Sequence, residues 1–150
     1  MKKLFTIGYE QAKSDAVIGE LKRAKVGLVV DTRAVAASRR PGFSKRQLAA
    51  GLDEAGIGYL HLQKLGTPKE GRDAAHAGHL DKMFKIYERH IKTPEAREQL
   101  DELTALVKSG RSVCLLCYER DVAQCHRRRI AEFICERTGV DVKHLAAPFL

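Results

Sequence analysis

The stretch from Cys117 to Arg127 carries the residues best suited to chemistry, because it places two cysteines, a histidine and an arginine within one short polar segment. It follows the apolar run Val113–Leu116, so Cys117 is predicted to end a strand and the helix after it to open on Cys125. A helix start has free backbone N–H groups and positive partial charge, which lower the pKa of a thiol and attract anions. The segment therefore predicts a reactive cysteine or an oxyanion site.

Cys125 is the first candidate nucleophile or redox thiol. It lies near the helix start if Asp121 is the N-cap and Gln124 the capping-box partner, and several arginines lie close to it in sequence. The alternative is a small buried apolar residue. Cys117 is a candidate nucleophile, resolving thiol or core residue. The chain has four cysteines, and we expect them to be thiols rather than disulfides.

A metal site is not expected. Cys117, Cys125 and His126 suggest zinc, but adjacent residues at a helix start point about 100° apart and do not converge easily. Cys114 and Cys117 form a CxxC pair, yet an odd separation on a strand sends them to opposite faces. A structural zinc site also needs a second ligand pair. His126 is instead a candidate for substrate binding, or a polar residue that bonds a loop carbonyl.

Two acidic residues are candidates for orienting a substrate or moving protons. Glu119 lies in the polar segment between the cysteines, and Asp31 follows the second predicted strand. Asp31 lies two residues before Arg33, so the two side chains either hold a substrate anion or close the loop with a salt bridge. Arg127 has the same two alternatives, because it can hold an anion at the helix start or pair with a buried carboxylate.

A second basic segment follows Arg33. Arg39 and Arg40 are candidates for contacting phosphates, with Phe43 stacking on a base. The alternative is a solvated loop in which Phe43 packs under Ser44 as a hydrophobic staple. Ser44 and the glutamine three residues later predict a capping box for the next helix.

Strand and helix signals alternate along the chain. Helices are expected after Asp15, after Ser44, over 79–92, from Thr93-Pro94 to near Gly110, and after Asp121, with residues 63–78 as a long loop of functional interest. The predicted strands are Leu4–Ile7, Val26–Val30, Ile57–Leu62, Arg111–Leu116 and Val140–Leu145.

This order predicts a single-domain, three-layer α/β/α fold over residues 1–150, with a mainly parallel sheet of about five strands. Ligands bind at the carboxyl edge of such sheets. That edge would gather Tyr9, Asp31, Arg33 and the Cys117–Arg127 segment, so a single site is expected there.

Length and charge set the remaining expectations. A chain of 150 residues fits one domain with a substantial core. The start, from Met1 to Gly8, has no apolar run long enough for a signal peptide or membrane helix, so a cytoplasmic protein without membrane contact is expected. The net charge of +8 suggests an anionic small molecule or nucleic acid as partner.

Several segments resemble the DUF488 family of small bacterial and archaeal proteins of unknown function. The family is named for its unknown activity, so the resemblance implies the fold and the same site residues without implying a reaction. Tyr9 is part of the first segment and matches the family, whereas Thr32 stands where valine is usual. The segments are Thr6–Tyr9, Val30–Arg33, Ser38–Phe43, Leu60–Gly66, and Leu115–Glu119 with Cys125–Arg127.

The sequence thus favours an enzyme that uses a site lined by cysteine and arginine on an anionic substrate, as a cysteine-dependent transferase or hydrolase. Cys117 or Cys125 would supply the thiolate, and Arg33 and Arg127 would hold the anion. The alternative is a non-catalytic nucleic-acid-binding module linked to DNA maintenance.

Overall fold

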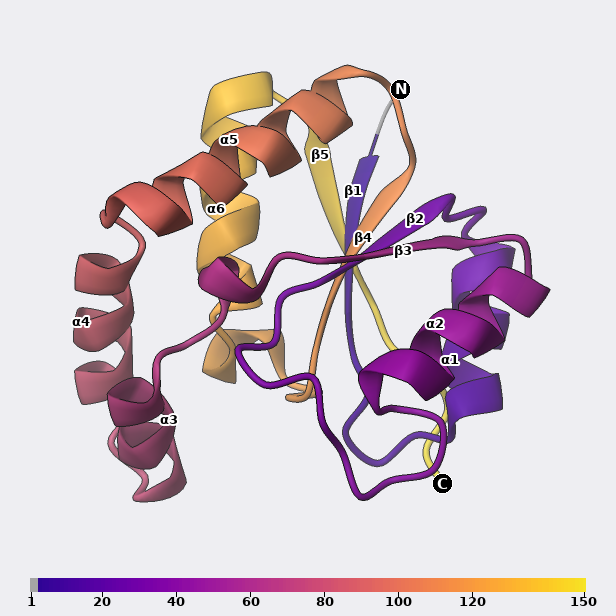
Figure 1. Ribbon diagram of the computed structural model, residues 1–150, viewed down its shortest axis with the longest axis horizontal. Helices are drawn as coiled ribbons and strands as arrows, with labels where there is room; N and C mark the ends of the chain where they lie inside the picture. Colours follow the sequence, from indigo (N-terminus) through magenta and orange to yellow (C-terminus); the bar gives the residue numbers. More distant parts are fainter. Residues whose placement is uncertain (1–2) are drawn as a thin grey trace.

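A five-stranded, all-parallel sheet forms the centre of the computed structural model, which describes residues 3–150 (Figure 1). The strand order is β3-β2-β4-β1-β5, so β4 lies in the middle. The predicted α/β fold with a parallel sheet of about five strands is confirmed. The strands are β1 (Lys3–Gly8), β2 (Leu28–Asp31), β3 (Gly58–His61), β4 (Val113–Cys117) and β5 (Asp141–Leu145).

Helices cover both faces of the sheet. In Figure 1, α1 and α2 lie on one side, and α3 to α6 lie on the other. The helices are α1 (Ser14–Arg23), α2 (Lys45–Glu54), α3 (Lys69–His76), α4 (Leu80–His90), α5 (Pro94–Lys108) and α6 (Arg127–Thr138), with short 3₁₀ turns η1 (Gln63–Leu65) and η2 (Val122–Gln124). None of the helices in residues 3–150 is long and apolar enough to span a membrane. Met1 and Lys2, the start of the segment judged for a signal peptide, lie outside the described residues.

The core has two halves because successive strand residues point to opposite faces. Leu115 and its alternating neighbours pack against α5 and α6. Cys114 and Leu116 pack against α1 and α2 on the other face. The two faces of β4 are both buried, as expected for a central parallel strand. The predicted divergence of Cys114 and Cys117 follows from this alternation.

The carboxyl ends of the strands meet at one edge, as predicted. Gly8 of β1 is opposite Cys117 of β4, and Asp31 of β2 is opposite Leu116. Asp31 and Cys117 are therefore close along the edge. However, alternation places the Asp31 side chain on the face of α1 and α2, whereas Cys117 faces α6. The expected edge cavity therefore takes in Tyr9, Arg33 and Cys117, but the Asp31 side chain does not line it.

The segment 63–78 is not the structureless loop that the sequence predicted. It holds η1 and the two-turn helix α3. Pro68 takes the N-cap position, and only Gly71 and Ala74 of α3 are buried. Such a short helix, rich in charged residues, has too few apolar positions to give a helical pattern. It is held by packing against α4, through Ala74 and Met83.

The helix cap predicted at Thr93 forms, whereas the capping box predicted at Ser44 does not. Thr93 caps α5 as expected, with its hydroxyl accepting from the backbone N–H of Ala96. Ser44 does take the N-cap position of α2, but its side chain bonds Ser38 instead of a helix N–H. The Gln47 carboxamide accepts from the backbone N–H of Gly42, which lies outside the helix. The tight 38–44 loop therefore uses both groups that the capping box would need.

Candidate active site

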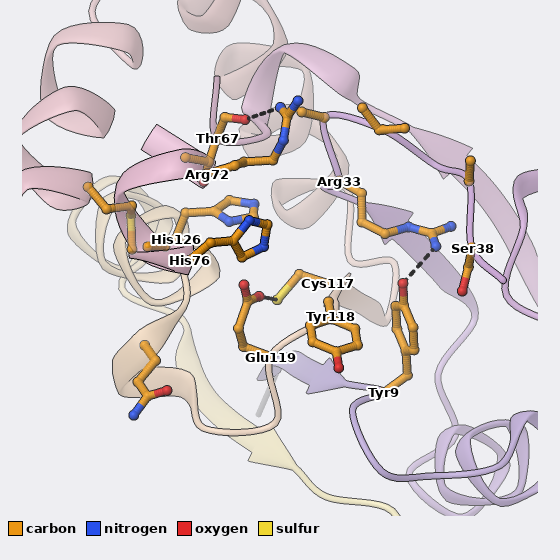
Figure 2. A pocket seen from close by; sticks show the side chains of 16 residues that line it. Tyr9, Arg33, Ser38, Thr67, Arg72, His76, Cys117, Tyr118, Glu119 and His126 are labelled. Atoms are coloured by element: carbon orange, nitrogen blue, oxygen red, sulfur yellow. Dashed lines mark hydrogen bonds between the residues drawn. The ribbon is translucent and has the colours of Figure 1, made fainter. Parts of the chain in front are cut away.

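A cavity of about 300 Å³ opens at the carboxyl edge of the sheet. Its walls come from Tyr9 after β1, the loop after β2, Thr67 and α3, Met83 of α4, and the end of β4 with the segment after it. Figure 2 shows Cys117, Glu119 and His126 on one side of this space, with His76 beside them. Polar groups on the wall include Arg72, His76, Cys117, Tyr118, Glu119 and His126. A cavity of this size admits a small molecule.

Cys117 is the sulfur that the cavity reaches. It is the last residue of β4 and lies on the cavity wall, although the residue as a whole is only 1% exposed. Cys125 lies behind it and does not line the cavity. The two cysteines form a disulfide, so the expectation of four free thiols is wrong. Cys114 and Cys135 are the free cysteines of the described chain.

Arg127 lies behind the cavity and is 1% exposed. Its Nη1 donates to the Sγ of Cys117 at 3.0 Å and also to the carbonyl of Glu119. Its Nε donates to the hydroxyl of Thr6 at 3.2 Å, and its Nη2 donates to the carbonyl of Arg120 at 3.2 Å. The predicted role in direct substrate binding does not fit this position, because Arg127 is absent from the cavity wall.

The charge of Arg127 is only partly balanced. No carboxylate in residues 3–150 forms a salt bridge with it. Burial lowers its pKa to about 10, and the nearby charge of Glu119 offsets this only in part. The guanidinium still carries its proton at neutral pH. A buried cation needs a nearby anion, and the atom best placed to supply one is the sulfur of Cys117 in its reduced, ionised form.

Glu119 provides a proton carrier next to Cys117. Its Oε2 lies 3.6 Å from the Sγ of Cys117, and the side chain points into the cavity (Figure 2). Burial raises the pKa of Glu119, while its own backbone N–H and Arg127 act in the opposite direction. A carboxyl group with a raised pKa can hold a proton closer to neutral pH than an exposed glutamate, as a general acid must.

His126 lines the cavity and also contacts Cys125. Its Nε2 lies 2.9 Å from the carbonyl of Thr32, which can only accept, so Nε2 carries the proton. This leaves Nδ1 as an acceptor, 3.8 Å from the Sγ of Cys125. Burial lowers the pKa of His126 to about 4, so the ring is neutral at pH 7 and only a weak base.

The helix start predicted at Cys125 falls slightly later. Asp121 caps η2 rather than α6, with its carboxylate accepting from the N–H of Ala123 at 2.9 Å. Cys125 follows η2 and precedes α6. The first N–H of α6, that of Arg127, donates to the Sγ of Cys125 at 3.4 Å. The helix start therefore does contact this sulfur, as the sequence suggested.

Asp31 and Arg33 form a buried ion pair. Arg33 donates from Nε and Nη2 to the two carboxylate oxygens of Asp31, at 2.9 and 2.7 Å. Its Nη1 donates to the hydroxyl of Tyr9 and the carbonyl of Phe43. Burial alone would lower the pKa of Arg33, but the hydrogen bonds and charge of Asp31 outweigh it and raise it. Of the two alternatives for this pair, the geometry favours loop closure over anion binding.

The basic loop after β2 is also held by internal contacts. Phe43 is fully buried and stacks on Tyr9, with ring centroids 4.2 Å apart. Arg40 donates to the carbonyls of Tyr9 and Ala12. Arg39 is exposed and away from the cavity wall. Phe43 therefore cannot stack on a base in this conformation, and Arg40 has a structural partner.

Sequence reasoning missed Arg72 and His76, the cationic and titratable groups that α3 brings to the cavity (Figure 2). Arg72 is part-buried and donates from Nη1 to the carbonyl of Thr67 at 2.8 Å. It has no salt bridge within the described chain, so its other donors remain available to an anion. Both residues lie in the 63–78 segment, whose length indicated a functional role but did not indicate which residues carry it.

Three side chains could approach one metal ion. The ligand atoms of Cys117, Glu119 and Cys125 lie within 4.8 Å of one another. This set falls one short of the four ligands of a structural zinc site, and its sulfurs are joined. The cation of Arg127 at the Cys117 sulfur also opposes a second positive charge there. The arrangement fits an arginine–thiolate pair better than a metal.

Comparison with known proteins agrees with the resemblance seen in the sequence. Residues 13–134 match the family model described as "Domain of unknown function DUF488". The chain belongs to the DUF488 family. The match includes the Asp31–Arg33 pair, α3 and both cysteines of the disulfide, and it leaves out the first resembling segment, Thr6–Tyr9. No curated protein and no solved structure matches the chain significantly.

Proposed function

We propose that this DUF488 protein is an enzyme in which the thiolate of Cys117 attacks a small anionic substrate bound in the cavity. The observation that carries the proposal is the contact between the buried guanidinium of Arg127 and the Sγ of Cys117, at 3.0 Å, with no carboxylate of residues 3–150 in a salt bridge to that guanidinium. A cation at this distance favours the thiolate, which is the nucleophilic form of cysteine.

The neighbouring groups fit the requirements of covalent catalysis. Glu119 is close enough to receive the proton of Cys117 and later to protonate a leaving group. The nucleophile sits at the end of a central strand, where packing on both faces fixes its position. The cavity keeps the sulfur from bulk solvent while admitting a small molecule.

Arg72 is the group assigned to the substrate anion. Arg33 also lines the cavity, but its donors are taken by Asp31, Tyr9 and the carbonyl of Phe43, and Arg127 lies behind the wall. Arg72 lines the cavity with donors to spare. A guanidinium can bind a carboxylate or phosphate oxygen with two parallel hydrogen bonds. His76, on the next turn of the same helix, faces the same space and can assist as a donor.

The nucleic-acid-binding alternative has less support. Its specific elements were Phe43 as a stacking platform and Arg39 and Arg40 as phosphate contacts. Phe43 is buried against Tyr9 and Arg40 bonds backbone carbonyls, so only the exposed Arg39 keeps the role assigned to it. Non-specific attraction from the charge of +8 does not need these contacts.

Iodoacetamide and iodoacetate test the proposal as a matched pair, because both alkylate thiolates and they differ chiefly in charge. The protein is first reduced, and the labelled cysteines are identified by peptide mapping. We expect Cys117 to be alkylated with a midpoint below the value of about pH 8.5 typical of free cysteine. Arg127→Met should raise this midpoint by about 1 unit or more, whereas Arg128→Met, on the same helix, should leave it unchanged.

Arg72→Ala reports on the anion. It should slow alkylation of Cys117 by iodoacetate and leave the rate with iodoacetamide nearly unchanged. Replacing Arg39 by Ala serves as the control for a general loss of surface charge and should affect neither rate. The proposal is wrong if Cys117 in the folded, reduced protein reacts no faster than the buried Cys114, or if its pH midpoint does not respond to Arg127.

A further inference from the structure

The two bonded cysteines have different access and different partners. Cys117 lines the cavity and contacts Arg127 and Glu119. Cys125 is buried behind it, and its sulfur faces Nδ1 of His126 and the first N–H of α6. Only one sulfur of the pair can therefore meet a molecule in the cavity. The other is within bonding reach of the first and has its own proton acceptor.

We propose that Cys117 and Cys125 form a redox pair that reduces small, negatively charged disulfides, with Cys117 as the attacking thiol and Cys125 as the resolving thiol. This inference rests on the proposed function, because it requires Cys117 to be the nucleophile. The cavity of about 300 Å³ limits the substrate to a low-mass disulfide. Cys117, a residue that is 1% exposed, is out of reach of a disulfide on the surface of another folded protein.

The first step is attack of the Cys117 thiolate on one sulfur of the substrate RSSR. A sulfur–sulfur bond forms between Cys117 and RS, the substrate disulfide breaks, and the first RS⁻ leaves. Glu119 is placed to give this leaving group a proton. Arg72 holds the anionic part of the substrate at the cavity wall. The protein now carries a mixed disulfide, which is the usual intermediate of thiol–disulfide exchange.

The second step closes the intramolecular bond. The thiol of Cys125 loses its proton to solvent by way of Nδ1 of His126, its nearest acceptor, and the thiolate, which the first N–H of α6 contacts, attacks the Sγ of Cys117. The Cys117–Cys125 disulfide forms, the mixed disulfide breaks, and the second RS⁻ leaves. Two protein thiols have been oxidised and one disulfide has been reduced to two thiols. An external dithiol restores the reduced pair by the reverse exchange.

Trapping the mixed disulfide tests the order of the two cysteines. Cys135→Ser protein serves as the parent, because it removes the exposed cysteine. The reduced parent is mixed with dithiodiglycolate, the dianionic disulfide of mercaptoacetic acid, and analysed by intact mass and peptide mapping. The parent should end as the Cys117–Cys125 disulfide without an adduct. Adding Cys125→Ser should leave one mercaptoacetate on Cys117, and adding Cys117→Ser should give no adduct.

Rapid acid quenching of the parent keeps the test valid if Cys125→Ser does not fold. A transient adduct should then appear on Cys117 and decay into the intramolecular disulfide. In the same parent, His126→Asn should slow the decay of the adduct by roughly 10-fold, a larger effect than on its formation. This separation of the two steps would not follow from a purely structural role of His126.

A second experiment compares disulfides of different charge. The neutral bis(2-hydroxyethyl) disulfide and the cationic cystamine should react more slowly than dithiodiglycolate, and Arg72→Ala should remove the preference. An adduct that persists with Cys125 present, or one that maps to Cys125, overturns the redox inference. If Cys117 still shows the fast, Arg127-dependent alkylation, the proposed function survives that result. Loss of the alkylation as well would remove both.

Discussion

Arg127 shows how a single buried charge can identify a reactive atom. A buried guanidinium is costly unless anions or hydrogen-bond acceptors surround it. Here its acceptors are two carbonyls, a hydroxyl and a sulfur. Of these, only the sulfur can become an anion at accessible pH. Arg127 therefore holds the segment after β4 in place through the two carbonyls, and it favours the thiolate of Cys117 through the sulfur.

His126 yields a prediction about pH and stability. Its pKa in the folded protein is lowered by burial to about 4, whereas that of an unfolded histidine is about 6.5. The unfolded chain therefore binds a proton first as pH falls, so stability is lost between about pH 6.5 and pH 4. We expect this group to remove about 3 kcal/mol of unfolding free energy over that range, measured by urea denaturation.

The His126→Asn variant isolates this contribution, because an asparagine amide can still donate to the carbonyl of Thr32 but does not titrate. The variant should be less stable than the parent at pH 7, and the gap should close or reverse at pH 4.5. Glu119 acts in the opposite direction, since its raised pKa favours the folded state as pH falls. It is common to both proteins and cancels in the comparison. Parallel pH profiles would contradict the buried, neutral histidine.

At the scale of elements, the site depends on how closely two backbone segments approach. Gly8 ends β1, and a Cβ placed on it would lie 1.8 Å from the carbonyl oxygen of Glu119. That carbonyl also accepts from Arg127. Gly8 thus allows the segment after β4 to fold back over the edge of the sheet, where it presents Glu119 to the cavity.

Gly8→Ala should therefore push the segment after β4 away from β1. We expect a loss of about 1–3 kcal/mol in unfolding free energy, as for other overpacked sites, together with slower alkylation of Cys117. Gly19→Ala in α1 is the matched control, because no atom lies within 4 Å of its added Cβ. The control should gain about 0.5–1 kcal/mol and keep the alkylation rate, since alanine favours a helix interior. Equal stability of the two variants would contradict the close approach.

Sequence patterns predicted the elements that are long or fully buried. The apolar runs at Val113–Leu116 and before Asp31 gave central parallel strands, and Thr93-Pro94 gave the start of α5. Helix α3 was missed because it contributes only Gly71 and Ala74 to buried positions. Its packing against α4 is a tertiary contact that no local pattern contains. Arg72 and His76 were missed with it.

The site was only partly predictable for a related reason. The sequence indicated that Cys117, Glu119, Cys125 and His126 lie near one another, and they do. It did not indicate on which face of the sheet each side chain lies. That depends on the register between strands, which puts Asp31 and Cys117 on opposite faces. Nor did it decide whether Arg127 would hold an anion or be buried, since both roles were open for a residue at a helix start.

At the scale of the whole molecule, the net charge of +8 and the parallel topology act together. The topology brings the ends of β1, β2 and β4 to one edge and opens the cavity there. The excess positive charge attracts anions to the surface in general and raises their concentration near the cavity. Selectivity for one anion then depends on local groups, of which Arg72 is the cationic one with available donors.

The disulfide connects β4, the middle strand of the sheet, to the residues just before α6. Cys117 and Cys125 are separated by 8 residues in sequence, so the bond closes a short loop. The chain-entropy relation for such a loop gives a stabilisation of about 2–3 kcal/mol relative to the reduced protein.

Urea denaturation should show this difference between the oxidised protein and the same protein held in a phosphine reductant. Cys125→Ser should be insensitive to the reductant, since Cys114 and Cys135 are free in the structure. If the reductant shifts Cys125→Ser as much as the parent, the effect does not come from this pair. If it shifts neither, the bond does not connect β4 and α6 in the oxidised protein, and both sulfurs are thiols beside Arg127 and His126.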